Sequence, residues 1–325
     1  MQESEANLNK YLNPKRYWQF FINKAISISS PVIKIWEKKQ YKKYAAIPIK
    51  HQPIFIIGAP RTGSTILYQT LTNQLDVLYI DNLACRFNKN LFFGFCLSNL
   101  FFKQKAHNCF SSNHGATKGL HSPSECGGFW YRWLPSDRHF IDHDDVTDKM
   151  VKEIREEITA ITNKYDKPVV FKNLNAGQRL RLIKKVFPDA RFIFSKREPL
   201  YTAQSILKAK RKLKLSDNKF WGIMPKNVDE LSTRAWPEQI VGQIYYIEKQ
   251  IEQDLALFDN GDSYTVSYSN LNNDTVDNLK EYFALQPRCN YKESDINLNE
   301  NISITLEEQN LIETEINNLD WSNFK

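Results

Sequence analysis

The chain has 325 residues, of which 42% are apolar and 25% are charged, as in an ordinary folded protein with a substantial core. The balance of 44 basic against 37 acidic residues gives a net charge of +7, which suits an anionic ligand but is too diffuse to indicate nucleic acid. No stretch approaches the roughly 18 apolar residues of a membrane-spanning helix, the N-terminus lacks a secretion-signal pattern, and five scattered cysteines include no C-x-x-C pair, so we expect a cytoplasmic protein without zinc or disulfides.

Residues 1–50 are basic and rich in aromatic side chains, and we expect them to form a helical N-terminal lead-in. Rings such as Tyr17, Trp18 and Trp36 stand among lysines. The rings could pack on the main body, or the helix could lie on a membrane surface, because basic amphipathic segments do either. We expect residues 51–325 to form a single α/β domain.

The first firm strand is the continuous apolar run 53–57, which ends at Gly58. Such a run is typical of a strand buried on both faces of a parallel sheet. After a short loop, Ile66, Leu67 and Leu71 recur with helical spacing. The sequence therefore predicts a strand, a loop and a helix in succession.

Four more short apolar runs predict strands, and helical patterns separate most of them: residues 77–80, 169–171, 191–195 and 264–268. The clearest helix follows Pro237, with an apolar stripe from Ile240 to Phe258 that Asn260 and Gly261 terminate. Alternating strands and helices predict a three-layer α/β/α fold of the P-loop type, with a mostly parallel central sheet.

Residues 81–165 are predicted to be a helical insertion between two strands. The insertion contains the very apolar run 91–97 and an aromatic cluster at 129–133. These side chains could pack as core beneath a long loop, or they could line an apolar pocket for an acceptor.

The loop at residues 58–65, GAPRTGST, has two glycines five positions apart, as in the phosphate-binding pattern G-x-x-x-x-G-K-[ST]. In that pattern successive backbone N–H groups and a helix N-terminus converge on an anion. Ser64 replaces the expected lysine, and Arg61 supplies a cation within the loop.

A nucleoside-triphosphate enzyme also needs a carboxylate that holds magnesium, often at the end of a neighbouring strand. The predicted strands 169–171 and 191–195 are followed by Lys172 and by Lys196 and Arg197. Positive charge at these positions favours an anion site without a metal. A nucleotide-dependent phosphotransferase or kinase is kept as the alternative function.

Together with residues 192–205, FIFSKREPLYTAQS, the loop resembles the sulfotransferase family that uses 3′-phosphoadenosine 5′-phosphosulfate (PAPS), in particular its bacterial branches. The resemblance extends over roughly residues 53–285. It implies that the loop binds the 5′-phosphosulfate and that Arg197 and Ser205, eight residues apart, bind the 3′-phosphate. Tyr268 begins a segment similar to the family's Y-E-D-L. The donor-binding residues implied are Arg61, Thr62, Gly63, Ser64, Thr65, Arg197, Ser205 and Tyr268.

Two departures from the family pattern concern the nucleotide. Ile66 stands where some members place an aromatic ring against adenine, and the R-K-G triplet of cytosolic members is absent from the sequence.

The resemblance implies metal-free, in-line transfer of a sulfuryl group to a hydroxyl or amine. Lys172 resembles the family's strand-end catalytic lysine, and we expect Lys172 and Arg61 to stabilise the bridging oxygen of the departing nucleotide. The acceptor would be a small molecule, a lipid or a carbohydrate. Neither the acceptor nor the oligomeric state is indicated by the sequence.

The sequence offers several candidates for the general base and does not decide between them. Leu174 occupies the position of the histidine base in one branch of the family, whereas carboxylate-using members place the base where Asp81 stands. Glu125 is the second candidate, although Ser122 and Glu125 together could instead form a capping box at a helix start. His121 and His114 are further candidates.

Overall fold

A five-stranded parallel sheet forms the centre of the fold, in the order β2-β5-β1-β6-β7. The computed structural model describes residues 14–113, 115–216, 219–259, 261–293 and 296–321. The strands in chain order are β1 Ile54–Gly58, β2 Leu78–Tyr79, β5 Val169–Lys172, β6 Arg191–Lys196 and β7 Ser263–Ser267. Each predicted apolar run overlaps one of these strands, with ends that differ by at most one residue, and the expected α/β fold with a parallel sheet is confirmed.

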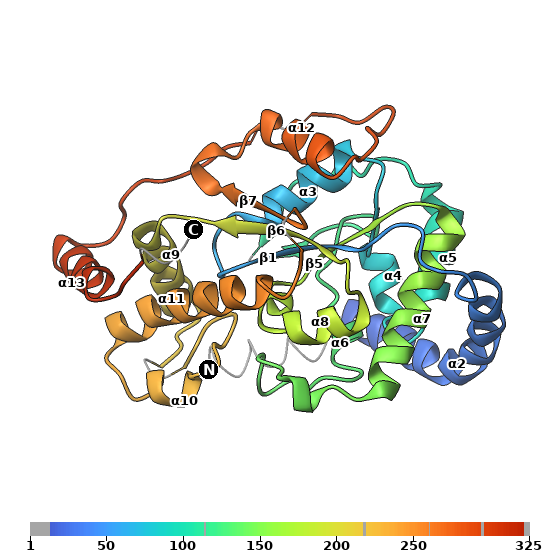
Figure 1. Cartoon of the computed structure of the whole chain (residues 1–325), viewed down its shortest axis with the longest axis horizontal. Helices are drawn as coiled ribbons and strands as arrows, with labels where there is room; N and C mark the ends of the chain where they lie inside the picture. Colours follow the sequence, from blue (N-terminus) through green and yellow to red (C-terminus); the bar gives the residue numbers. More distant parts are fainter. Residues whose placement is uncertain (1–13, 114, 217–218, 260, 294–295, 322–325) are drawn as a thin grey trace.

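Helices cover both faces of the sheet, as Figure 1 shows, with α3 and α12 above it and α8 and α11 below it. The alternation of side chains along β1 explains this arrangement, since Ile54 and Ile56 face one core cluster whereas Phe55 and Ile57 face the other. Phe55 is fully buried, and its ring stacks on Phe171 with centroids 5.2 Å apart. The remaining helices and turns are α2 Pro14–Tyr44, α3 Ser64–Gln74, α4 Asn82–Arg86, α5 Leu91–Phe102, α6 Gly127–Trp130, η1 His143–Asp145, α7 Asp148–Tyr165, η2 Leu174–Gln178, α8 Leu180–Val186, α9 Pro199–Lys212, α10 Val228–Leu231, α11 Trp236–Leu255, η3 Tyr268–Asn270, α12 Asn273–Tyr282 and α13 Leu306–Asn317.

Helix α11 ends at Leu255, earlier than the predicted stop at Asn260 and Gly261. The chain tightens after Leu255, where the N–H groups of Leu257 and Phe258 bond to carbonyls three residues before them. Phe258 is therefore buried beyond the helix rather than on it.

Between β2 and β5 the chain passes through α4, α5, the short hairpin β3 (Ser112–Asn113) and β4 (Ala116–Thr117), α6 and α7. The apolar run at the start of α5 is core, because Leu91, Phe92 and Phe95 are buried. Of the two alternatives for that run, this outcome favours core packing over an apolar acceptor pocket. The division of the chain into a lead-in and one domain stays a prediction.

Helix α2 is fixed to the insertion by one face. Trp36 and Tyr41 each place a ring 5.8 Å from the centroid of Phe92. Glu37 is fully buried between them and accepts hydrogen bonds from Asn90 Nδ2 at 2.9 Å and from the Phe93 N–H at 3.0 Å. Across the ranges that the structure describes, no helix is long and apolar enough to cross a membrane.

The burial of Glu37 makes the stability of the protein depend on pH. Burial, together with the nearby charge of Glu157, raises the pKa of Glu37 from 4.5 to about 7. Because the folded carboxyl binds its proton more tightly than the unfolded one, its contribution is complete below pH 4.5 and is lost as the pH rises through 7. Relative to Glu37→Gln, we expect the wild-type free energy of unfolding to fall by about 3 kcal/mol over that window. Urea unfolding at pH 4.5, 6 and 8 measures this, and parallel pH profiles for the two proteins would contradict it.

Candidate functional site

The loop between β1 and α3 can form only because two of its residues lack a Cβ. A Cβ on Gly58, whose φ is 147°, would collide with the carbonyl oxygen of Ser195 at the end of β6. Gly63 has φ 81°, and a Cβ there would lie 2.5 Å from Cδ2 of Tyr268. The Ser195 hydroxyl donates to the Thr62 carbonyl at 2.7 Å, which ties the loop to β6. The backbone before α3 is therefore held against the ends of its neighbours.

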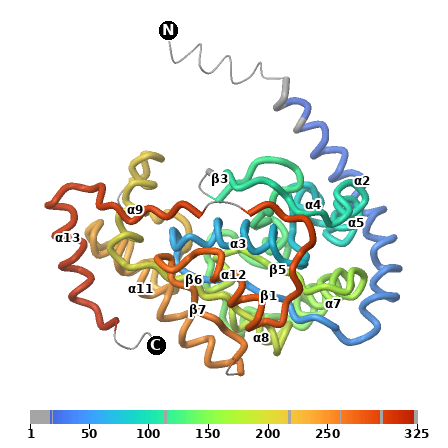
Figure 2. The backbone as a smooth tube through the Cα atoms, turned by 90° about the horizontal axis from the view of Figure 1, so that it is seen from above, coloured from blue at the N-terminus to red at the C-terminus, as the bar shows by residue number. Residues whose placement is uncertain are grey.

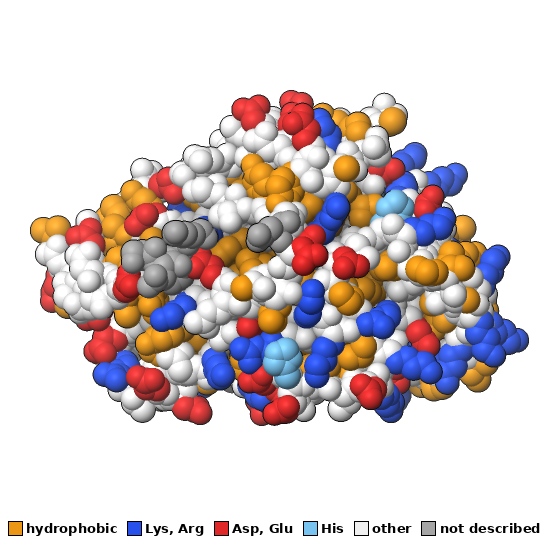
Figure 3. Space-filling view, viewed as in Figure 1, with side chains coloured by type: hydrophobic (Ala, Val, Ile, Leu, Met, Phe, Trp, Pro, Cys, Tyr) orange, Lys and Arg blue, Asp and Glu red, His pale blue; other side chains and the backbone are white. Residues whose placement is uncertain are grey.

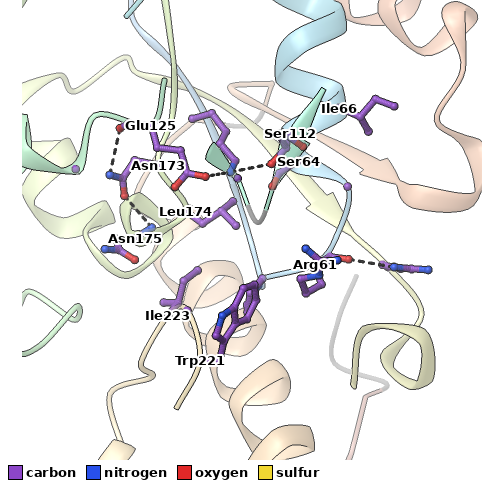
Figure 4. Close-up of a pocket in the computed structure, with 18 of the residues that line it drawn as sticks. Arg61, Ser64, Ile66, Ser112, Glu125, Asn173, Leu174, Asn175, Trp221 and Ile223 are labelled. Carbon is purple, nitrogen blue, oxygen red and sulfur yellow. Dashed lines mark hydrogen bonds and ion pairs between the residues drawn. The ribbon is translucent and has the colours of Figure 1, made fainter. Parts of the chain in front are cut away.

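A cavity of about 660 Å³ opens at the carboxyl ends of the central strands. In parallel α/β sheets this edge is where ligands bind. Figure 4 shows Glu125 and Asn173 on one side of the cavity and Arg61 on the other. The predicted site residues among those that line it are Arg61, Gly63, Ser64, Thr65, Glu125, Lys172, Arg197 and Tyr268.

Arg61 extends toward α9. Its Nε donates to Ser205 Oγ at 2.8 Å, and its carbonyl accepts a hydrogen bond from Arg197 NH1 at 3.3 Å. The φ of Arg61 is 71°, in the left-handed region that residues with a Cβ rarely adopt. Such strain persists only where the surroundings fix the backbone. The structure thus gathers Arg61, Arg197 and Ser205 into one group, which we call the arginine clamp.

The arginine clamp has the electrostatics of an anion site. Burial, and then the charge of Arg197, lowers the pKa of Arg61, and burial likewise lowers the pKa of Arg197. The Arg197 guanidinium lies 4.0 Å from the centroid of the Tyr268 ring. Its Nε is buried and donates no hydrogen bond to any residue of the described ranges, although Glu300 Oε1 lies 4.0 Å away as an ion-pair partner. An anion bound here would offset the repulsion between the two guanidinium groups and could accept a hydrogen bond from Nε of Arg197.

Lys172, at the end of β5, connects the loop to the insertion. Only 4% of its side chain is exposed, and Nζ donates to Thr65 Oγ1 at 3.2 Å in the first turn of α3. The same Nζ forms an ion pair with Glu125 Oε1. Gly115, in the β3–β4 hairpin, lies over this pair, since a Cβ on it would be 2.6 Å from Glu125 Oε1. The cavity therefore holds a carboxylate and an ammonium in direct contact.

Asp81 does not line the cavity that contains Lys172 and Glu125. It is 1% exposed and caps α4, accepting from the Ala84 N–H at 2.7 Å and from Ser98 Oγ at 2.5 Å. Its Oδ2 also lies 3.2 Å from Nδ1 of His121, and both residues line a separate small pocket. The structure does not bring Asp81 or His121 together with Lys172. His114 lies outside the described residues.

The alternative capping box at Ser122 and Glu125 is wrong. Helix α6 begins at Gly127 with Cys126 as its N-cap residue. The Ser122 hydroxyl bonds to the Lys118 carbonyl, and the Glu125 carboxylate faces Lys172. The pattern S-x-x-E failed as a helix signal because the chain is still irregular there.

Several residues of the cavity wall were not among those predicted from the sequence. Trp221 lies with its ring centroid 5.7 Å from the Arg61 guanidinium, and no sequence signal pointed to it. Lys212 follows Ser205 by seven residues on α9, a spacing that places both on one helix face and was therefore available as a signal. Tyr131 and Asn175 face the cavity and are bonded to each other at 3.1 Å.

His139 also lines the cavity but is poorly suited to act as a base. Its Nδ1 accepts a hydrogen bond from the Met224 N–H at 2.8 Å, which leaves the proton on Nε2. Burial, with a contribution from Arg179, lowers the pKa of His139 to about 4. At neutral pH this ring can donate a hydrogen bond to a ligand.

Within the described ranges, no three or more His, Cys, Asp or Glu side chains lie close enough together to hold a metal ion. Metal independence of the reaction stays a prediction.

The chain is similar to a known protein family in sequence and to known proteins in fold. The sequence profile of the sulfotransferase family matches residues 53–283. The sulfotransferase STF9 from Mycobacterium avium has a similar fold, with a TM-score of 0.51 and 13% identity over 88% of this chain and 72% of that one. For the sulfotransferase STF1 from Mycobacterium tuberculosis H37Rv the TM-score is 0.47 and the identity 15%, over 90% of this chain and 79% of that one. No curated protein matches the chain in sequence.

Replacing Gly63 tests the contact between the loop and Tyr268. Gly63→Ala combines a positive φ with a collision against the Tyr268 ring, and we expect it to cost about 2–3 kcal/mol of unfolding free energy. We also expect it to weaken binding of 3′,5′-ADP (PAP) by about tenfold or more, because Tyr268 would move away from Arg197.

The matched control is Gly261→Ala, where φ is 106° but no atom lies within 4 Å of the added Cβ. This variant should lose about 1 kcal/mol from backbone strain alone and bind PAP normally. Equal effects of the two variants on PAP affinity would show that the Tyr268 contact does not support binding.

Proposed function

This chain belongs to the sulfotransferase family, and we propose that it transfers a sulfuryl group from PAPS to a hydroxyl or amine of its acceptor. The observation behind this proposal is the meeting of three cations, Arg61 from the loop after β1, Lys172 at the end of β5 and Arg197 just after β6, with the carboxylate of Glu125 in one cavity. Cations stabilise the anionic donor and the charge that develops on it, and the carboxylate removes a proton from the acceptor.

The arginine clamp is proposed to bind the 3′-phosphate of the donor. It offers two guanidinium groups, the Nε of Arg197, which donates no hydrogen bond within the described residues, and the hydroxyl of Ser205. The sequence predicted that Arg61 would bind the 5′-phosphosulfate as part of the loop and act on the bridging oxygen beside Lys172. Its hydrogen bond to Ser205 favours the 3′-phosphate instead.

The loop backbone and the start of α3 are proposed to hold the 5′-phosphosulfate. Ser64 and Thr65 line the cavity in the first turn of α3, where they place hydroxyls at the helix N-terminus. Because Lys172 Nζ contacts Thr65, its charge lies on the donor side of the cavity. Lys172 is therefore suited to stabilise the bridging oxygen as the bond from oxygen to sulfur breaks.

Glu125 is proposed as the general base. Its carboxylate contacts Lys172 from the insertion side, and 40% of its side chain is exposed, so an acceptor can reach it. In the free protein each of the two charges neutralises the other. When an acceptor hydroxyl approaches, Glu125 can take its proton while Lys172 turns toward the donor.

The acceptor side of the cavity is polar. Tyr131, His139 and Asn175 present hydroxyl, imidazole and amide groups there. These groups suit an acceptor that carries several hydrogen-bonding groups, as a carbohydrate or a polar metabolite does.

The role of Arg61 can be tested with two nucleotides. We expect Arg61→Ala and Ser205→Ala each to weaken PAP binding by about tenfold or more, while the affinity for AMP, which lacks a 3′-phosphate, changes little. Isothermal titration calorimetry measures both constants. If Arg61→Ala weakened AMP and PAP equally, Arg61 would act on the 5′ side.

The enzymatic claim is tested by incubating the protein with sulfur-labelled PAPS and a cell extract and finding which fraction gains label. We expect Glu125→Gln to slow label transfer by about 10²–10⁴-fold and to keep PAP affinity. Asp81→Asn should retain transfer, because Asp81 caps α4 away from the cavity. If no labelled product formed although the protein binds PAP, the proposed transferase activity would be refuted. If Asp81→Asn lost transfer and Glu125→Gln kept it, the general base would be Asp81 and not Glu125.

A further inference from the structure

An apolar stripe follows the side of α2 that faces away from the rest of the fold. We call Trp18, Phe21, Ile28, Val32 and Ile35 the outer stripe; these side chains are between 61% and 71% exposed. They follow one another at intervals of three, four or seven residues, which places them on one helix face. Such a row of large exposed apolar side chains indicates a binding surface.

The opposite face of α2 fixes the direction of the outer stripe. Ser30 Oγ donates to Asn90 at 2.6 Å, and Glu37 and Tyr41 are buried against the insertion. At about 100° per residue, these side chains lie on the far side of the helix axis from Ile28 and Val32. Figure 2 shows the N-terminal half of α2 projecting beyond the body of the fold.

The charge of α2 is almost entirely positive. The helix contains eight lysine and arginine residues and one acidic residue, the buried Glu37. Lys39 and Lys43 continue the line of the outer stripe by one and two turns, and both are exposed. Figure 3 shows basic side chains gathered at the edge of the molecule where α2 lies.

We propose that the outer stripe docks α2 on an anionic lipid surface. The apolar side chains would enter the boundary between headgroups and acyl chains, and the lysines would lie against lipid phosphates. Tyr17 and Phe20, which are 54% and 61% exposed, add aromatic rings of the kind enriched at this boundary. This surface goes beyond the proposed sulfuryl transfer and does not rest on it.

A second copy of the chain fits the outer stripe less well. Two copies of α2 would bring like charges together, with no exposed acidic side chain of the described helix to pair with them. Pro31 also stands inside the helix, where it removes one backbone hydrogen bond and bends the axis. A bent, basic helix is better matched to an anionic bilayer than to a coiled-coil partner.

Flotation with vesicles tests the proposal. We expect the full chain to bind vesicles of phosphatidylglycerol and phosphatidylcholine, to bind vesicles of phosphatidylcholine alone at least about tenfold more weakly, and to be released by high salt. The variant Trp18→Ser/Phe21→Ser/Ile28→Ser should lower binding by about tenfold or more. Lys39→Gln/Lys43→Gln should remove much of the preference for the anionic lipid.

Two controls separate the outer stripe from general effects. Leu306→Ser removes a side chain that is 72% exposed on α13, at the opposite end of the molecule in Figure 1, and should bind vesicles normally. An unchanged midpoint of thermal unfolding in the triple variant shows that it is folded. The proposal would be overturned if the wild type bound no vesicles, or if it bound neutral and anionic vesicles equally. It would also be overturned if the wild type bound no vesicles but self-associated through the outer stripe, so that the triple variant was monomeric.

Discussion

The close approach of β1 to β6 is the constraint on which the site depends. At Gly58 the two strands are so near that a Cβ would collide with the Ser195 carbonyl, and the Ser195 hydroxyl holds the loop at Thr62. Because the loop is held there, Arg61 emerges beside α9 and reaches Ser205. A residue larger than glycine at the end of β1 would separate the strands and, with them, the cations that the cavity needs to hold an anion.

Much of this framework could be predicted from the sequence because its signals are local. Continuous apolar runs mark strands buried on both faces, and two glycines five positions apart mark a loop that approaches an anion closely. Arg197 and Ser205 could be paired in advance because a strand end and the following helix fix their separation. The resemblance to the sulfotransferase family was drawn from these same residues.

The remaining features depend on contacts between distant parts of the chain. Glu125 meets Lys172 across 47 residues, a stretch that includes the long helix α7, and no periodicity encodes that meeting. The S-x-x-E pattern even favoured a helix cap. The direction of Arg61 follows from its positive φ, which residue type alone does not reveal. The order of the strands likewise arises from crossovers that the pattern of apolar runs leaves open.

The two sides of the cavity come from separate stretches of the chain. Arg61, Lys172 and Arg197 lie at or just beyond the carboxyl ends of adjoining parallel strands, Arg61 in the loop after β1, whereas Glu125 and Tyr131 belong to the segment between β2 and β5. Mutations in that segment can reshape the acceptor side while the hydrogen-bonded register of β1, β5 and β6 keeps the donor side unchanged. Such a division allows one scaffold to diversify its acceptors during evolution without having to reinvent the way it holds the donor.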